Sequence, residues 1–271
     1  MKKETLTTLC CPFCQTTLSL NIEQESKIIE SGELTCAGCE RTFPIREGIV
    51  HFIAPQELEG SNRRFAGFYN RLAPLYSLSM KAVFLPFGGE RKARMEILEH
   101  LELKGGRILE VSIGSGDNLS YLFELAGEGE IYGIDISIGQ LSRCRSLCMR
   151  RGWQVELFLA TAEQLPFKTD TFDSVLHIGG INFFSNKQKA IEEMIRVARP
   201  GNKIVIADEA ERFAKRLDPS LAASSPGKGS DEIETTLSDL VPDTMEEVRM
   251  DGIWRMHGKY HGYCLEFRKP A

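Results

Sequence analysis

The segment from Arg107 to Asn118 most constrains what this chain can fold into. It reads RILEVSIGSGDN, which is an apolar run typical of a buried β-strand, with an acid at position 110 and a turn containing Gly114 and Gly116. About one strand length later, a second apolar run (IYGI) ends in Asp135. Glycine lets the backbone approach a ligand closely, and a carboxylate at the end of the next strand can accept hydrogen bonds from both ribose hydroxyls. The sequence therefore predicts a site for a nucleoside-containing cofactor.

The same turn lacks the features of a diphosphate site. The third glycine of a dinucleotide-binding fingerprint is missing, and so is the Lys-Ser/Thr of a phosphate loop. Glu110 precedes the glycines, where a carboxylate repels phosphate but attracts a cationic amino-acid group. Because S-adenosylmethionine carries an ammonium group and a sulfonium, this charge favours it over NAD or ATP.

Downstream of the turn, strand and helix patterns alternate. Such alternation predicts an α/β fold with a parallel sheet covered by helices. Strands are expected near 107–112, 130–135, 155–160, 172–178 and 203–208, and helices near 118–126, 137–151 and 186–198. Two further β-rich runs, 246–255 and 260–268, flank Gly258 and predict a hairpin.

The N-terminal region holds a cysteine pattern typical of a metal site. Cys11 and Cys14 form one Cys-x-x-Cys pair, and Cys36 and Cys39 form another after 21 intervening residues. Four thiolates suit a closed tetrahedral Zn²⁺ site of structural or recognition type, with iron in a rubredoxin-like site as the alternative. Cys10 is expected to be a bystander, although a slight register shift would let it replace Cys11.

This pattern also suggests a division of the chain. Residues 1–54 are expected to form a zinc-ribbon module, because a unit this small buries little apolar surface and needs a bound metal to stabilise its fold. Residues 55–61 are expected to be a linker, and residues 62–271 the cofactor-binding domain.

The bulk properties exclude some classes of protein. A net charge of −5 and a pI near 5.7 argue against a strongly basic nucleic-acid binder. The N-terminal residues lack the apolar run of a signal peptide, and no run approaches the roughly 18 apolar residues of a membrane span. We therefore expect a cytoplasmic protein.

Residues 159–167 (LATAEQLPF) follow the third expected strand, where small side chains allow the backbone to approach an adenine edge. With this motif added, residues 65–271 resemble the class I S-adenosylmethionine-dependent methyltransferases. The resemblance implies a seven-stranded, mostly parallel, Rossmann-like sheet with helices on both faces and an antiparallel last hairpin strand. It implies cofactor contacts from Glu110, Ser112, Gly114, Gly116, Asp135, Thr161, Ala162 and Glu163. The family usually has glycine where Ser112 stands and often Asp where Thr161 stands.

Two shorter segments narrow the resemblance. Residues 68–76 (FYNRLAPLY) resemble a segment of the ubiquinone/menaquinone-biosynthesis methyltransferases that forms a lid over the cofactor, which makes Tyr69 and Tyr76 lid candidates. The alternative is that both belong to the core of an amphipathic helix. Residues 34–50 resemble the small zinc-ribbon activators of tRNA, rRNA and release-factor methyltransferases, and the ribbon of a bacterial rRNA guanine methyltransferase family.

No catalytic residue is assigned, because methyl transfer mainly requires alignment of the acceptor and exclusion of water. His177, at the end of the fourth expected strand, either borders the cofactor or takes a proton from a hydroxyl or thiol acceptor. The favoured hypothesis is an enzyme that methylates a small molecule of quinol, phenol or thiol type. The alternatives are an RNA methyltransferase guided by the ribbon and a non-catalytic cofactor-binding scaffold. The ribbon's five Lys/Arg against seven Glu weigh against RNA.

Overall fold

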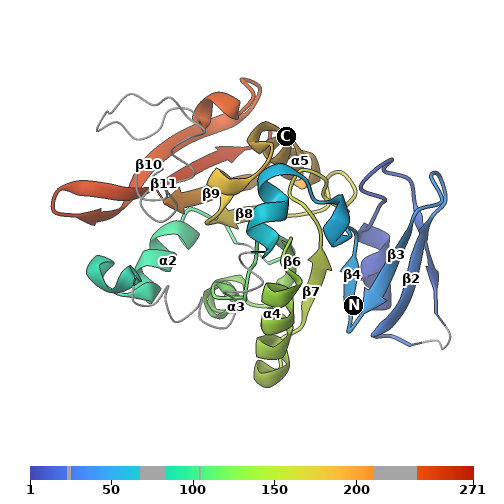
Figure 1. Ribbon diagram of the computed structural model, residues 1–271. Helices are drawn as coiled ribbons and strands as arrows, with labels where there is room; N and C mark the ends of the chain where they lie inside the picture. Colours follow the sequence, from blue (N-terminus) through green and yellow to red (C-terminus); the bar gives the residue numbers. More distant parts are fainter. Residues whose placement is uncertain (23–25, 68–82, 104, 210–236) are drawn as a thin grey trace.

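A computed structural model describes residues 1–22, 26–67, 83–103, 105–209 and 237–271. Its strands form one mixed sheet in the order β1-β2-β3-β4-β7-β6-β5-β8-β9-β11-β10 (Figure 1). The strands are β1 (Leu18–Asn21), β2 (Ser31–Cys36), β3 (Thr42–Arg46), β4 (Ile49–His51), β5 (Arg107–Val111), β6 (Glu130–Asp135), β7 (Val155–Leu159), β8 (Ser174–Ile178), β9 (Lys203–Glu209), β10 (Glu246–Met256) and β11 (Lys259–Arg268). The predicted parallel sheet and terminal hairpin are confirmed.

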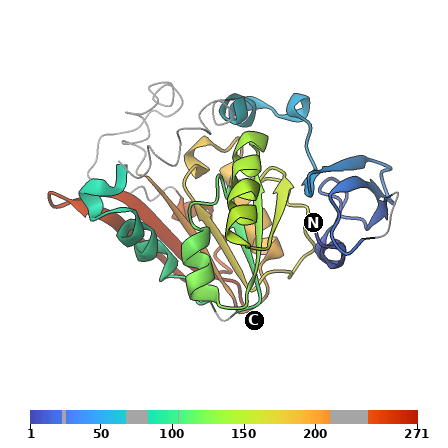
Figure 2. The ribbon, with the colours of Figure 1, turned by 90° about the horizontal axis from the view of Figure 1, so that it is seen from below.

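The helices cover both faces of this sheet. The α-helices are α2 (Glu90–Leu98), α3 (Leu119–Ala126), α4 (Ile138–Arg151) and α5 (Lys187–Val197), and residues 60–67 are also helical. The 3₁₀ turns are η1 (Lys3–Thr8), η2 (Pro55–Glu57), η3 (Leu85–Phe87), η4 (Ile181–Phe183) and η6 (Ser238–Leu240). Helices α2, α3 and α4 lie on one face, as Figure 2 shows, and the apolar residues of α5 belong to the core of the other. None of the helices described here is long and apolar enough to span a membrane.

The sheet is larger than the seven strands expected from the sequence. Strands β5 to β11 come from residues 107–268, and four more come from the N-terminal region. β4 pairs in parallel with β7, with Val50 beside Phe158 and His51 beside Leu159, and the Phe52 amide donates to the Leu159 carbonyl at 2.9 Å. A strand at a sheet edge presents unpaired backbone groups, and strand addition satisfies them. In the described residues the sheet has eleven strands, seven of them from residues 107–268, so the seven-stranded expectation is corrected.

The N-terminal region also covers a face of the sheet beside β7. Residues 160–173, which connect β7 to β8, contain no helix. Instead the N-terminal residues pair with this connection, and Leu9 forms an isolated antiparallel β-bridge with Phe167. The Cys10 amide donates to the Pro166 carbonyl at 3.0 Å, and the Lys168 amide donates to the Thr8 carbonyl at 2.9 Å. Phe167 lies edge-on to Phe158 beneath this contact. N-terminal residues thus fill a place where a crossover helix commonly packs. The boundaries at residues 54 and 61 stay a prediction.

The parallel strands β5 to β9 bring their carboxyl ends to one edge of the sheet. Ligands of open α/β sheets bind outside this edge, at the point where the strand order reverses. Here the order reverses between β5 and β8, because β6 and β7 follow β5 on one side and β8 and β9 lie on the other. Glu110 of β5, Asp135 of β6 and His177 of β8 therefore lie at the edge where we expect the cofactor.

Candidate cofactor and metal sites

The turn after β5 adopts left-handed backbone angles that favour glycine. Gly114 has a φ of +57° and Gly116 a φ of +83°. A Cβ atom at Gly116 would lie 2.7 Å from Leu119 Cδ1 and 2.9 Å from Cys144 Sγ, so any other residue there would force these side chains to move. Ser112 also has a positive φ, +63°, which is uncommon for a residue with a side chain. The structure thus explains why glycine usually stands at this position in the family that the sequence resembles.

Glu110 lies at the end of β5 and is fully buried. Its Oε1 accepts a hydrogen bond from Asn118 Nδ2 at 2.6 Å, whereas its Oε2 has no partner among the residues that the structure describes. Burial raises the pKa of this carboxyl to about 8, against the lowering effects of Asn118 and Arg94. A buried carboxyl with one open oxygen fits a cationic group such as the ammonium of S-adenosylmethionine.

Asp135, at the end of β6, joins the two turns of the site. Its Oδ2 accepts from the Gly114 amide at 2.9 Å, and its Oδ1 accepts from the Ser137 amide at 2.8 Å. The side chain is 8 % exposed, and burial raises its pKa to about 6. Each carboxylate oxygen keeps acceptor capacity for a ribose hydroxyl. Contact with ribose stays a prediction, and the two amide bonds show that Asp135 also holds the glycine turn in place.

The segment Thr161–Glu163 follows β7 at the same edge. The amide of Ala160, just before it, donates to the Asp135 carbonyl at 3.1 Å, which fixes this segment beside the second turn. Ala162 is buried and Thr161 is half-buried. Glu163 Oε1 accepts from Asn62 Nδ2 at 3.0 Å and from the Ser185 amide at 3.1 Å. Glu163 therefore ties the helical residues 60–67 to the loop before α5, and its contact with adenine stays a prediction.

His177, at the end of β8, is fully buried and packs against Phe184. Its Nδ1 lies 3.0 Å from the Val111 carbonyl oxygen, which can only accept, so Nδ1 carries the proton. Nε2 then presents a lone pair that has no partner in the described residues. Burial lowers the pKa of the imidazole and keeps it neutral. Both predicted roles, bordering the cofactor and accepting a proton, stay predictions.

Sequence reasoning missed three polar residues that the structure brings to this edge: Arg94, Asn118 and Gln140. All three are buried, and Gln140 Oε1 has no hydrogen-bond partner in the described part of the chain. An arginine on the apolar face of an amphipathic helix was the available signal for Arg94. The lid candidates Tyr69 and Tyr76 lie outside the described residues.

The four predicted metal ligands do meet in the structure. The Sγ atoms of Cys11, Cys14, Cys36 and Cys39 all lie within 4.8 Å of one another. Cys11 Sγ is 3.6 Å from Cys39 Sγ, and Cys14 Sγ is 3.3 Å from Cys36 Sγ. Tetrahedral zinc with bonds of about 2.3 Å to sulfur separates its ligands by about 3.8 Å, so the cluster fits Zn²⁺. Cys10 is buried outside the cluster.

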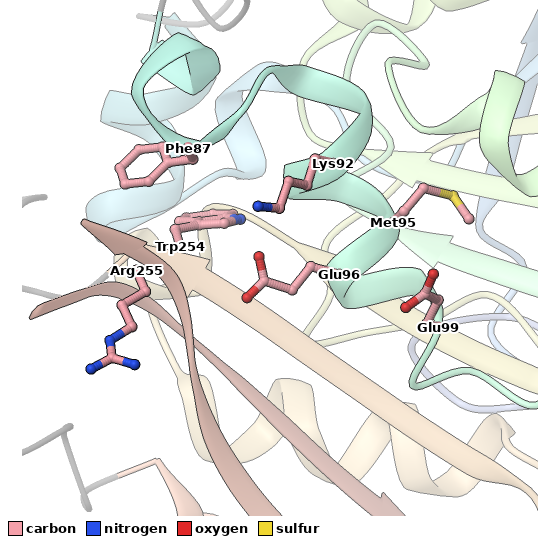
Figure 3. A pocket seen from close by; sticks show the side chains of 7 residues that line it. All are labelled: Phe87, Lys92, Met95, Glu96, Glu99, Trp254 and Arg255. Atoms are coloured by element: carbon pink, nitrogen blue, oxygen red, sulfur yellow. The ribbon is translucent and has the colours of Figure 1, made fainter. Parts of the chain in front are cut away.

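A separate cavity of about 330 Å³ lies between α2 and the β10–β11 hairpin. Figure 3 shows Phe87 and Trp254 on one side of it, with Lys92 and Glu96 of α2 facing the indole. Its lining residues include none of the predicted cofactor contacts. The cavity is therefore distinct from the predicted cofactor site at the carboxyl edge of the sheet, which stays a prediction.

Two family models match the chain. Residues 108–201 match the family described as a methyltransferase domain, and residues 2–48 match the Trm112p-like proteins. The methyltransferase match covers Glu110, the glycine turn, Asp135 and His177, and the Trm112p-like match covers all four clustered cysteines.

Named relatives and a solved structure extend this likeness. A ubiquinone/menaquinone biosynthesis C-methyltransferase of Syntrophotalea carbinolica is 29 % identical over 57 % of this chain, and a demethylmenaquinone methyltransferase of Thermus thermophilus is 32 % identical over 52 %. The matched region spans 63 % of the length of each of these relatives. A solved complex of the Haloferax volcanii Trm112 methyltransferase activator with a putative methyltransferase matches at a TM-score of 0.57 and 14 % identity, covering 75 % of this chain and 98 % of that one. At this identity the match shows the fold alone.

The cysteine cluster yields a metal prediction. Replacing Cys36 by Ser removes one thiolate ligand, so we expect elemental analysis of the purified protein to find zinc falling from about one ion per chain to less than about 0.2. Cys10→Ser is the matched control and should keep its zinc, because Cys10 lies outside the cluster. Full zinc in Cys36→Ser, or loss in Cys10→Ser, would contradict the ligand set.

The left-handed backbone at Ser112 yields a stability prediction. Glycine adopts this φ without strain but gains backbone entropy on unfolding, so Ser112→Gly should change the free energy of unfolding by less than about 1 kcal/mol. Ser112→Val places a β-branched side chain at a positive φ and should lower the free energy of unfolding by about 1–3 kcal/mol. Urea unfolding measures both, and equal stability of the two variants would argue against the strained turn.

The raised pKa of Glu110 yields a proton-linkage prediction. With a pKa near 8, the free protein holds a proton on Glu110 at pH 7. An ammonium group beside Oε2 favours the carboxylate and lowers this pKa, so affinity should rise as pH increases toward 8. Binding at pH 7 should release about 0.5–0.9 proton. Calorimetry in buffers of different ionisation enthalpy measures this release. It should vanish in Glu110→Gln, and its persistence there would assign the proton elsewhere.

Proposed function

We propose that this protein, an enzyme with a class I S-adenosylmethionine-dependent methyltransferase domain behind a Trm112-like ribbon, methylates a small molecule of quinol, phenol or thiol type. The observation that carries the cofactor assignment is the open oxygen of buried Glu110 beside the glycine turn, one strand away from Asp135. These groups match the charge and the hydroxyls of the cofactor in the order in which it would lie across the strand ends.

S-adenosylmethionine, when bound, supplies an already activated methyl carbon. The chain's own contribution is to bind and orient: Glu110 would hold the ammonium, the Ser112–Gly116 turn the methionine part, and Asp135 the ribose. The Nε2 lone pair of His177 would accept a proton from a hydroxyl or thiol acceptor, since its Nδ1 proton is engaged by the Val111 carbonyl. Burial lowers the pKa of His177, and buried Asp208 opposes this lowering, which favours the imidazolium that results.

Two observations support a small-molecule acceptor. The named relatives are enzymes of quinone biosynthesis, so a quinol-type ring is the first acceptor to test. The ribbon's last strand is used in pairing with β7, and its four-cysteine cluster leaves no open metal position for chemistry.

The ribbon favours one competing function. Its match to Trm112p-like proteins and its resemblance to activators of RNA methyltransferases support an RNA substrate. The acidic balance of residues 1–54 and the net charge of −5 oppose it, because phosphate contacts dominate nucleic-acid affinity. A cofactor-binding scaffold without transferase activity is the remaining alternative.

Transfer of a labelled methyl group separates these functions. The purified protein is incubated with methyl-tritiated S-adenosylmethionine and a fractionated cell extract, with Glu110→Gln as the matched control. We expect label in the organic-extractable small-molecule fraction with the unaltered protein only. Label in the macromolecular fraction that ribonuclease removes would establish the RNA function instead. Binding of S-adenosylmethionine without transfer to any fraction would support the non-catalytic scaffold.

A further inference from the structure

We propose that Arg94 of α2 is a positioning residue for the cationic end of the cofactor, acting through the side-chain amide of Asn118 to hold Glu110. Neither Arg94 nor Asn118 was singled out by the sequence. The proposal rests on the proposed function, since it assumes that Glu110 receives the cofactor's ammonium group.

Arg94 is a buried cation with several fixed partners. The residue is 6 % exposed. Its Nη1 donates to Asn118 Oδ1 at 2.6 Å, its Nε donates to Glu90 Oε1 at 3.0 Å, and its Nη2 lies 3.7 Å from Asp117 Oδ2. A planar guanidinium presents its donors in a rigid fork, so these contacts fix both the position and the tilt of the group.

The chemistry of the three groups determines how the Asn118 amide is oriented. Arginine can only donate, so the Asn118 atom that faces Arg94 Nη1 must be the amide oxygen, whatever the protonation state of Glu110. Asn118 must therefore turn its oxygen toward Arg94 and its Nδ2 toward Glu110 Oε1, 2.6 Å away. Without Arg94 the amide is free to flip, and its oxygen would then face the carboxylate. Arg94 thus keeps Oε1 of Glu110 engaged and leaves Oε2 as the oxygen open to a ligand.

The position of α2 is itself secured by strand β10, which packs in the same core as this helix. Trp254 of β10 donates its indole N–H to the Ala93 carbonyl at 3.0 Å, immediately before Arg94, and Figure 3 shows this indole against α2. The Trp254 ring packs edge-on against Phe84, over which the Arg94 guanidinium lies 5.4 Å from the ring centroid. Arg94 therefore reaches the turn from a helix that is anchored without the cofactor.

Arg94 also acts on Glu110 by charge. The charged or titratable groups that influence Glu110 are Arg94 from α2, Asp117 from the turn, Asp135 from β6 and Cys144 from α4. Arg94 is the cation in this set and lowers the Glu110 pKa, whereas Asp117 and Asp135 raise it. The positive charge therefore favours the carboxylate that an ammonium group needs.

The test compares two ligands that differ at the cationic end. Calorimetry measures the Kd of S-adenosylmethionine and of 5′-methylthioadenosine, which lacks the amino-acid part. Arg94→Met should weaken S-adenosylmethionine binding about 10- to 100-fold and change 5′-methylthioadenosine binding less than about twofold. Asn118→Asp, which cannot donate to Glu110, should show the same selective loss. Arg91→Met, on the exposed side of α2 where Arg91 pairs with Glu124, is the matched control and should leave both affinities unchanged.

A double-mutant cycle separates positioning from general loss of structure. In a Glu110→Gln background, Arg94→Met should weaken S-adenosylmethionine less than about twofold further, because the two residues act on the same contact. Equal weakening of both ligands by Arg94→Met and Asn118→Asp, or a full additional loss in the Glu110→Gln background, would overturn the positioning role. Failure of the unaltered protein to bind either ligand would instead overturn the proposed function.

Discussion

The edge of the sheet at which we propose the cofactor depends on the burial of one carboxyl group. Glu110 is fully enclosed, and a buried carboxyl must find hydrogen-bond or charge partners. Asn118 donates a hydrogen bond to Oε1, and Arg94 in turn donates one to the Asn118 amide oxygen. Oε2 has no partner in the described residues. The glycine turn after β5 has left-handed backbone angles, and Asp135 from β6 holds its Gly114 amide. Strand ends, turn and helix α2 therefore converge on the carboxyl group that we propose as the receptor of the cofactor's cationic group.

The ribbon belongs to the same structural unit in two ways. Its strand β4 extends the sheet at β7, and the residues before its first metal ligand cover the face beneath the helix-free connection to β8. Cys10, next to the ligand Cys11, is hydrogen-bonded to Pro166, and three to five residues earlier lie Thr161, Ala162 and Glu163 of the expected adenine segment. This short path links the cysteine cluster to the segment that follows β7.

Local patterns in the sequence were enough to predict the main strands, the terminal hairpin and the cysteine cluster. Apolar runs bounded by turns located the parallel strands and the hairpin, and the spacing of the cysteines located the metal cluster. The chemistry of an acid before a glycine turn predicted a cofactor contact at Glu110, which stays a prediction. The pairing of β4 with β7 could not be predicted in this way, because contact between strands about a hundred residues apart leaves no local signature. The same holds for Arg94, whose partner Asn118 lies 24 residues away, and for Glu163, which pairs with Asn62.

A crystal structure with S-adenosylhomocysteine, the product form of the cofactor that keeps the ammonium group and the ribose, tests the central claim most directly. The account predicts the ammonium within hydrogen-bonding distance of Glu110 Oε2 and the ribose hydroxyls at Asp135, with the chain of the turn unmoved. A ligand found elsewhere, such as in the cavity between α2 and the β10–β11 hairpin, would contradict it.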